Sequence, residues 1–229
     1  MEDMKKESPS LDNKDRLIRS FGRIKSRKLS DQKKYLLEEL LPNYQKNQPN
    51  SSETNILEIG FGFGDFLFEK AKKNPDKKLF GSEPHLNGVV NLLSKLQKEP
   101  QNNLAISLLD SRVFLEKIAD KTFDQVFILF PDPWPKLKHF KRRLLTTKFF
   151  DETLSPKMKS GAKLTIATDH DSYKTWILAE ILRSDKFLWD AKSKDNWQKF
   201  PEDWTKTKYQ KKAEIEGRVP VIFNLTHNA

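Results

Sequence analysis

The sequence contains no cysteine, which excludes disulfides, thiolate zinc sites and a cysteine nucleophile. Only four histidines are present, and no two have the spacing of a metal-binding pair, so no metal site is expected. Long apolar runs are missing too, since the longest near the middle of the chain covers only residues 126–130. The polar start MEDMKKESPS does not resemble a signal peptide. We therefore expect a cytoplasmic protein with no membrane partner.

Apolar residues are also scarce, at 36% of the 229 residues, yet 16 phenylalanines and 5 tryptophans supply enough bulk for one core. Lysine and arginine outnumber aspartate and glutamate by 42 to 32, which gives a formal net charge of +10. This balance favours polyanionic partners, although a basic protein that is merely soluble has the same composition.

The order of apolar runs predicts an α/β domain after a basic N-terminal segment. Residues 1–50 are predicted to be this segment, partly disordered, with a short helix from Ser30 to a stop at Pro42. In residues 51–229, strands are predicted at 55–59, 78–82, 103–109, 123–130, 163–168, 187–191 and 219–226. Helices are predicted between them at 65–73, 86–98, 111–118, 146–159 and 172–184. This alternation is typical of a Rossmann-like, doubly wound sheet of seven mostly parallel strands.

An acid stands at or just after the end of each of the first five predicted strands. These acids are Glu58, Glu83, Asp110, Asp132 and Asp169. Acids are depleted in strands, and the carboxyl ends of parallel strands share one rim, where ligands bind. The pattern therefore predicts a carboxylate-lined pocket for a cationic or polyhydroxylated ligand.

A glycine-rich loop, LEIGFGFGDF (57–66), follows the first strand and leads into a helix. Glycines allow positive φ and close approach of a ligand, although a tight turn without a ligand would use the same residues. Glu83 follows Gly64 by nineteen residues, where an acid holds a ribose diol. Because Glu58 and Asp65 flank the loop, the cationic S-adenosylmethionine is favoured over NAD(P), whose pyrophosphate is repelled by nearby carboxylates.

The fourth strand leads into PDPW (131–134) and then into a basic run at 136–148. Pro131 and Pro133 restrict the backbone and hold Asp132 on the rim, while Trp134 offers a flat surface for a ring. A proline turn over a buried tryptophan is the structural alternative. Two further basic segments, 16–34 and 206–212, accompany this run, so we expect a nucleic acid partner rather than a small acidic metabolite.

Seven stretches of the chain together resemble the tRNA (guanine-N7)-methyltransferases. They are RSFGRIKSRKLSDQKKYLLEELLP (19–42), LEIGFGFGDF (57–66), GSEPH (81–85), LLD (108–110), FPDPWPKLKHFKRRL (130–144), TIATDHDSY (165–173) and TKYQKKAEIEG (207–217). The proline-tryptophan and basic stretch is the most specific of them, whereas the glycine loop is shared with many methyltransferases.

The resemblance implies a class I methyltransferase fold and methyl transfer from S-adenosylmethionine to N7 of guanine 46 in the variable loop of tRNA. The cofactor contacts that it implies are Glu58, Gly60, Glu83, Asp110 and Asp132. The substrate contacts that it implies are Lys136, Asp169, Thr207, Lys208, Tyr209 and Gln210. Gln210 stands where the family usually has glutamate, and a neutral amide still hydrogen-bonds a base edge.

The chemistry fits these residues, because guanine N7 has a lone pair and no proton, so no general base is needed. Asp132 is the expected catalytic residue, since a carboxylate between sulfonium and alkylated purine stabilises positive charge throughout. Two alternatives stay open: a methyltransferase acting on another base, and a non-catalytic RNA-binding protein with a vestigial cofactor fold. All basic and cofactor elements lie on one chain, so we expect activity without a second subunit, as a monomer or homodimer.

Overall fold

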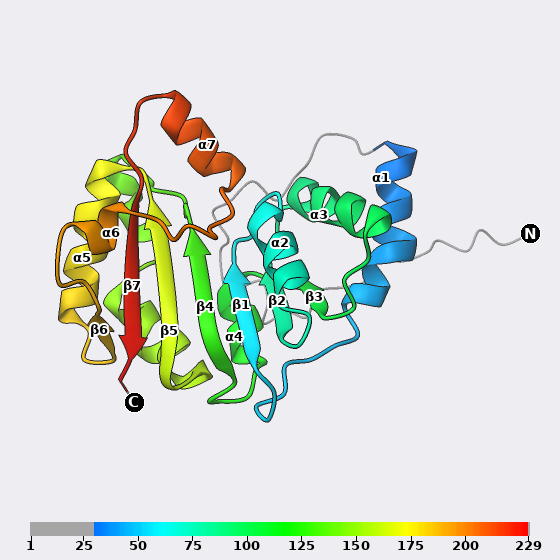
Figure 1. Ribbon diagram of the computed structural model, residues 1–229, viewed down its shortest axis with the longest axis horizontal. Coiled ribbons are helices and arrows are strands. Elements are labelled where there is room, and N and C mark those ends of the chain that lie inside the picture. Colours follow the sequence, from blue (N-terminus) through cyan, green and yellow to red (C-terminus); the bar gives the residue numbers. More distant parts are fainter. Residues whose placement is uncertain (1–29, 229) are drawn as a thin grey trace, which may run out of the picture.

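Seven strands form one sheet in the computed structural model, which describes residues 30–228 (Figure 1). The strands are β1 (Asn55–Ile59), β2 (Lys78–Ser82), β3 (Leu104–Ser107), β4 (Phe123–Leu129), β5 (Met158–Thr168), β6 (Phe187–Trp189) and β7 (Val221–His227). Their order across the sheet is β3-β2-β1-β4-β5-β7-β6, and only β7 runs antiparallel to its neighbours. The predicted fold class is confirmed.

The order of the strands explains where a ligand site belongs. The chain moves outward from β1 to β2 and β3, and then returns to place β4 on the other side of β1. Neighbouring loops therefore leave the carboxyl ends of β1 and β4 in opposite directions, which opens a crevice between them. Every residue of β1 is buried, as expected for a central parallel strand covered on both faces.

Helices cover the two faces of the sheet and enclose two cores. One core lies under α2 (Asp65–Lys73) and α3 (Leu86–Lys98), and includes Ile56, Phe66 and Leu92. The other lies under α4 (Ser111–Glu116), the π-helical turn η5 (Phe149–Leu154) and α5 (Asp171–Arg183). Among the described residues, no helix is both long and apolar enough to cross a membrane.

The helix predicted at 146–159 is present over residues 147–157, but it is irregular and ends two residues before the predicted end. The observed segment is η5, followed by the short 3-10 turn η6 (Ser155–Lys157), while Met158 and Lys159 already belong to β5. Pro156 interrupts helical hydrogen bonding, and Met158 pairs with Phe123 of β4. Sheet pairing therefore replaces the last turn of the predicted helix.

The N-terminal helix begins as predicted but does not stop at Pro42. It runs through α1 (Asp31–Tyr35), the π-turn η2 (Leu36–Leu40) and the 3-10 turn η3 (Leu41–Tyr44), with Pro42 in the first turn of η3, where no amide donor is needed. Leu36, Leu41 and Tyr44 are buried in the core under α3. Most of the predicted basic N-terminal segment, residues 1–29, lies outside the described residues, and the division near residue 50 stays a prediction.

Three short helical elements have no counterpart among the predicted ones. They are η4 (Leu137–Arg142), α6 (Asp195–Gln198) and α7 (Lys208–Ile215). Figure 1 shows α7 beyond the carboxyl ends of β4 and β5. The predicted basic segment 206–212 is thus placed at the same edge of the sheet as the acid-bearing strand ends.

Candidate active site

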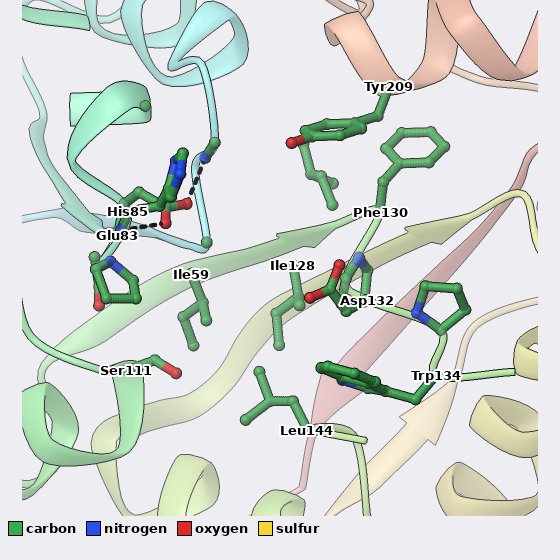
Figure 2. A pocket seen from close by; sticks show the side chains of 18 of the residues that line it. Ile59, Glu83, His85, Ser111, Ile128, Phe130, Asp132, Trp134, Leu144 and Tyr209 are labelled. Atoms are coloured by element: carbon green, nitrogen blue, oxygen red, sulfur yellow. Dashed lines mark hydrogen bonds between the residues drawn. The ribbon is translucent and has the colours of Figure 1, made fainter. Parts of the chain in front are cut away.

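A cavity of about 690 Å³ lies at the carboxyl ends of the parallel strands. Its floor includes Ile59 and Ile128, and Figure 2 shows Glu83, Asp132, Trp134 and Tyr209 around them. The predicted site residues among its lining are Gly60, Glu83, Asp110, Asp132, Asp169 and Tyr209. The sheet therefore brings four of the five predicted rim acids to one cavity.

The glycine loop forms one wall of this cavity and is fastened to β2. Gly62 has φ +54°, and its amide donates to Glu83 Oε2 at 2.9 Å. A Cβ atom on Gly88 of α3 would come within 2.2 Å of the Gly62 carbonyl oxygen. Glycine at 88 thus lets loop and helix meet backbone to backbone, whereas a Cβ atom at Gly62 would lie 3.1 Å from the Tyr209 ring.

Glu83 and Asp110 each accept hydrogen bonds from other groups of the protein. The second oxygen of Glu83 accepts from the His85 amide at 2.9 Å, and burial raises the pKa of this carboxyl. Asp110 caps α4 by accepting from the Arg112 amide at 3.0 Å, and it also accepts from the Arg112 guanidinium at 2.9 and 3.0 Å. Both carboxylates are consequently held in fixed orientations beside the cavity.

Glu58 differs from the other rim acids, because it lies inside the sheet with 2% of its surface exposed. It does not line the main cavity but a small hollow beside it, shared with Gly60 and Tyr209. Burial, followed by repulsion from Glu83 and Asp65, raises the pKa of Glu58 to about 8. The expectation that Glu58 stands on the open rim is therefore wrong, and the group is protonated at neutral pH.

Asp65, the second acid beside the glycine loop, is neutralised by a lysine. Lys95 of α3 lies 2.5 Å from Asp65 Oδ1 and also donates to the Phe63 carbonyl at 3.0 Å. Less negative charge thus surrounds the loop than the sequence alone indicates.

Asp132 sits on a strained corner that opens onto the cavity (Figure 2). The corner is bounded by two non-glycine residues with positive φ, Phe130 at 53° and Trp134 at 41°. Although the Asp132 side chain is exposed, the protein walls around it desolvate the carboxyl and raise its pKa. Pro131 and Pro133 restrict the backbone on both sides of Asp132, which lines the cavity beyond the carboxyl end of β4.

Aromatic rings face the cavity from opposite sides. Trp134 carries the Arg142 guanidinium 4.9 Å from its ring centroid and the His139 ring edge-on at 5.7 Å. Tyr209, on α7, reaches over the glycine loop from the other side, and Figure 2 shows Asp132 between the two rings. The space between them is bounded by flat apolar surfaces and a carboxylate.

Asp169 and Lys136 are placed differently from each other. Asp169 lines the cavity but is engaged by Arg218, whose Nε lies 2.5 Å from Asp169 Oδ2. Lys136 is exposed and lies just outside the cavity lining, at the N-terminal end of η4. Arg218 and Arg142 also line the cavity, and no local signal distinguishes them from the other basic residues of the chain.

The segment 207–210 forms the beginning of α7 rather than an extended loop. Thr207 caps the helix by accepting from the Gln210 amide at 3.1 Å, and the Lys208 ammonium lies 3.9 Å from the Phe63 ring centroid. Gln210 is 2% exposed; its side chain accepts from the Trp204 indole at 2.8 Å and donates to Glu214 at 3.2 Å. The expected substrate contact by Gln210 therefore does not fit this structure, in which only Tyr209 of the segment lines the main cavity.

No cluster of three or more potential metal ligands occurs in residues 30–228. His85 and His170 line the cavity, His139 packs on Trp134, and His227 hydrogen-bonds Ser155 at 2.8 Å in the core. The histidines are thus dispersed through the described part of the chain.

Comparison with known proteins adds a family match. A family model described as "Putative methyltransferase" matches residues 52–221. A tRNA (guanine-N(7)-)-methyltransferase of Hyphomonas neptunium is 37% identical over 205 residues, covering 85% of this chain and 93% of that protein. One of Roseobacter denitrificans is 35% identical over 217 residues, covering 87% and 92%. The crystal structure of the 16S rRNA methyltransferase KamB superposes with a TM-score of 0.55 over 89% of this chain and 96% of that one; at 14% identity, this likeness shows the fold alone.

Proposed function

The chain belongs to the tRNA (guanine-N7)-methyltransferase family, and on this basis we propose that it methylates N7 of guanine 46 in the variable loop of tRNA, using S-adenosylmethionine. The observation that carries the proposal is Asp132, held on the PDPW corner over the β1–β4 crevice between Trp134 and Tyr209. This arrangement provides a carboxylate and flat surfaces for a cationic reaction centre on a planar base.

The cavity fits S-adenosylmethionine by shape and by charge. Gly88 lets α3 approach the Gly62 carbonyl at the cavity wall, and burial raises the pKa of Glu83 and Asp132, an effect that a cationic ligand would oppose. We propose that Gly60, Glu83, Asp110 and Asp132 contact the cofactor in the cavity. Glu58 would contact it from the hollow beside Gly60. When bound, S-adenosylmethionine supplies an electrophilic methyl group on a sulfonium.

The residues of this chain would act by orientation and electrostatics. Guanine N7 needs no deprotonation, so Asp132 serves as a fixed negative charge rather than a base. Alignment of N7 in the cavity would contribute the larger share of the rate acceleration, because proximity and orientation are worth ~7–11 kcal/mol in well-aligned reactions. Asp169, at the rim, would contact the guanine once Arg218 releases it.

Phosphates of the tRNA would meet the basic surface around the cavity. Lys136 is exposed and follows the PDPW corner closely, Lys212 of α7 lines the cavity, and Lys208 of α7 lines the hollow beside it. Because these groups and the acidic cavity belong to one chain, we propose that it acts without a second kind of subunit, as a monomer or homodimer.

The target is tested with an unmodified tRNA transcript and labelled S-adenosylmethionine. We expect label to enter the transcript at N7 of guanine 46, and we expect a transcript with adenine at position 46 to take up none. Binding of both transcripts should be equal within a few-fold, since phosphates dominate affinity. Transfer that survives the change to adenine would move the target to another base, and tight binding without any transfer would favour a non-catalytic RNA-binding role.

Replacement of Trp134 tests the stacking surface. We expect Trp134→Ala to lower kcat/KM for tRNA by about 5- to 150-fold, which corresponds to ~1–3 kcal/mol of base stacking. Trp134→Phe keeps a flat face and should restore most of the loss. Steady-state kinetics at varied tRNA concentration provides the measurement, and an alanine variant with unchanged kcat and KM would refute stacking on this ring.

A further inference from the structure

Arg143 is the buried member of the basic run 136–148, with only 4% of its surface exposed. Its neighbours Lys138 and Lys141 are exposed. A guanidinium withdrawn from solvent cannot pair with the phosphates of a docking tRNA, so Arg143 needs another explanation than the rest of the run.

An aromatic cage holds the Arg143 side chain. Its guanidinium carbon lies 3.7 Å from the ring centroid of Phe140, 4.9 Å from that of Trp176 and 5.0 Å from that of Tyr173. The Trp176 indole donates to the Leu145 carbonyl at 2.7 Å, which fixes this wall of the cage to the chain just after Arg143. A planar guanidinium stacks on such rings, whereas the compact ammonium of lysine does so less well.

From this cage, Arg143 hydrogen-bonds the corner that carries Asp132. Its Nε donates to the carbonyl oxygen of Pro133 at 2.9 Å, and its Nη2 donates to Ser172 Oγ at 3.1 Å. Pro133 directly follows Asp132, so the bond attaches the catalytic corner to α5 through the arginine.

The corner needs such an attachment for two reasons. Phe130 and Trp134 hold positive φ without being glycine, and strained conformations of this kind persist only when their surroundings enforce them. Pro131 and Pro133 lack amide hydrogens, so the corner has fewer donors with which to stabilise its own shape. Arg143 supplies a donor from outside the corner, and its hydrogen bond to the Pro133 carbonyl helps to hold the corner in this shape.

We propose that Arg143 is a positioning residue, which holds Asp132 in place for methyl transfer through the Pro133 carbonyl and does not bind tRNA. The inference rests on the proposed function and extends it to a residue that the basic pattern alone would assign to RNA contact.

The test compares Arg143→Met and Arg143→Lys with the wild-type protein, using S-adenosylmethionine and unmodified tRNA. We expect Arg143→Met to lower kcat about 100-fold, because a displacement on the order of 1 Å costs that much in an aligned reaction. The KM for tRNA and the salt dependence of binding should stay unchanged, since no phosphate contact is lost. Arg143→Lys keeps the charge but loses the directed Nε–H bond and should be impaired as well. Arg183→Met removes an exposed arginine at the end of α5 and should have no effect.

A double-variant cycle separates positioning from general stability. In an Asp132→Asn background, we expect Arg143→Met to cost less than about threefold in kcat, because the group that it positions has lost its charge. The carboxyl carbon-13 resonance of Asp132, assigned by its loss in Asp132→Asn, should move in Arg143→Met and Arg143→Lys but not in Arg183→Met.

Three results would overturn the inference: an unchanged kcat, a loss confined to the KM for tRNA with a smaller salt slope, or fully additive costs in the double variant. An unmoved Asp132 resonance would overturn it even if the Met variant were destabilised. A wild-type protein that transfers no methyl group would instead refute the proposed function, and the resonance would still report whether Arg143 positions Asp132.

Discussion

We expect Asp132→Asn to lower kcat for tRNA methylation by about 10²- to 10³-fold, the loss typical of removing one preorganised electrostatic group from an active site. Asparagine keeps the shape of the side chain and its hydrogen-bonding oxygen but removes the charge. Single-turnover transfer from labelled S-adenosylmethionine is the appropriate measurement, because it isolates the chemical step from product release. The KM for tRNA should change little, because the carboxylate stabilises the positive charge that shifts during methyl transfer and does not hold the tRNA.

The dependence on pH gives the same prediction a second readout. Desolvation raises the pKa of Asp132 above its ordinary value of 3.8, so its ionised form is lost at a higher pH than for an exposed aspartate. As the pH falls through this raised pKa, kcat/KM should decline in the wild-type protein and stay flat in Asp132→Asn. Asp185→Asn, at an exposed turn after α5, provides the matched control and should follow the wild type. Equal rates for Asp132→Asn and wild type would remove Asp132 from the mechanism.

The second large effect concerns stability and comes from Glu58. The folded chain keeps this carboxyl protonated up to pH about 8, whereas the unfolded chain releases the proton near 4.5. Between these values the folded state binds one more proton, so stability falls as the pH rises, by about 1.4 kcal/mol per unit for this group. Over pH 5 to 8 the loss amounts to roughly 3 kcal/mol, or several degrees in Tm for a chain of this size.

Glu58→Gln should abolish this part of the pH dependence. Thermal unfolding of the variant and the wild type, without cofactor, should give a Tm difference that grows steadily in favour of the variant from pH 5 to pH 8. The slope is diagnostic. Glu58 Oε2 lacks a hydrogen-bond partner within residues 30–228, so the buried amide that replaces the carboxyl has an unfavourable environment, and this shifts the whole curve by a constant at every pH. Glu202→Gln, at an exposed loop position, should parallel the wild type. A Tm difference independent of pH would mean that Glu58 is ionised in the folded protein.

Local sequence patterns were sufficient to predict the sheet of this protein and the position of its cavity. Short apolar runs alternating with helical stretches predicted the seven strands, because strands covered by helices on both faces are mostly apolar. Acids directly after such runs predicted the cavity, because the carboxyl ends of parallel strands converge on one rim. Where an element depended on distant pairing, as for Met158 opposite Phe123, the local pattern failed.

The roles of individual side chains within that frame depended on tertiary contacts. Position along the chain was enough to assign Glu58, Gln210 and Arg143 to the neighbourhood of the cavity, since each lies in a stretch that borders a strand end or in a basic segment. It took the folded arrangement to establish that Glu58 is enclosed and protonated, that Gln210 is bound to Trp204, and that Arg143 is caged by Phe140 and α5. The physical reason is that burial and hydrogen bonding are set by whichever distant segments pack over a residue, and spacing along the chain does not encode them.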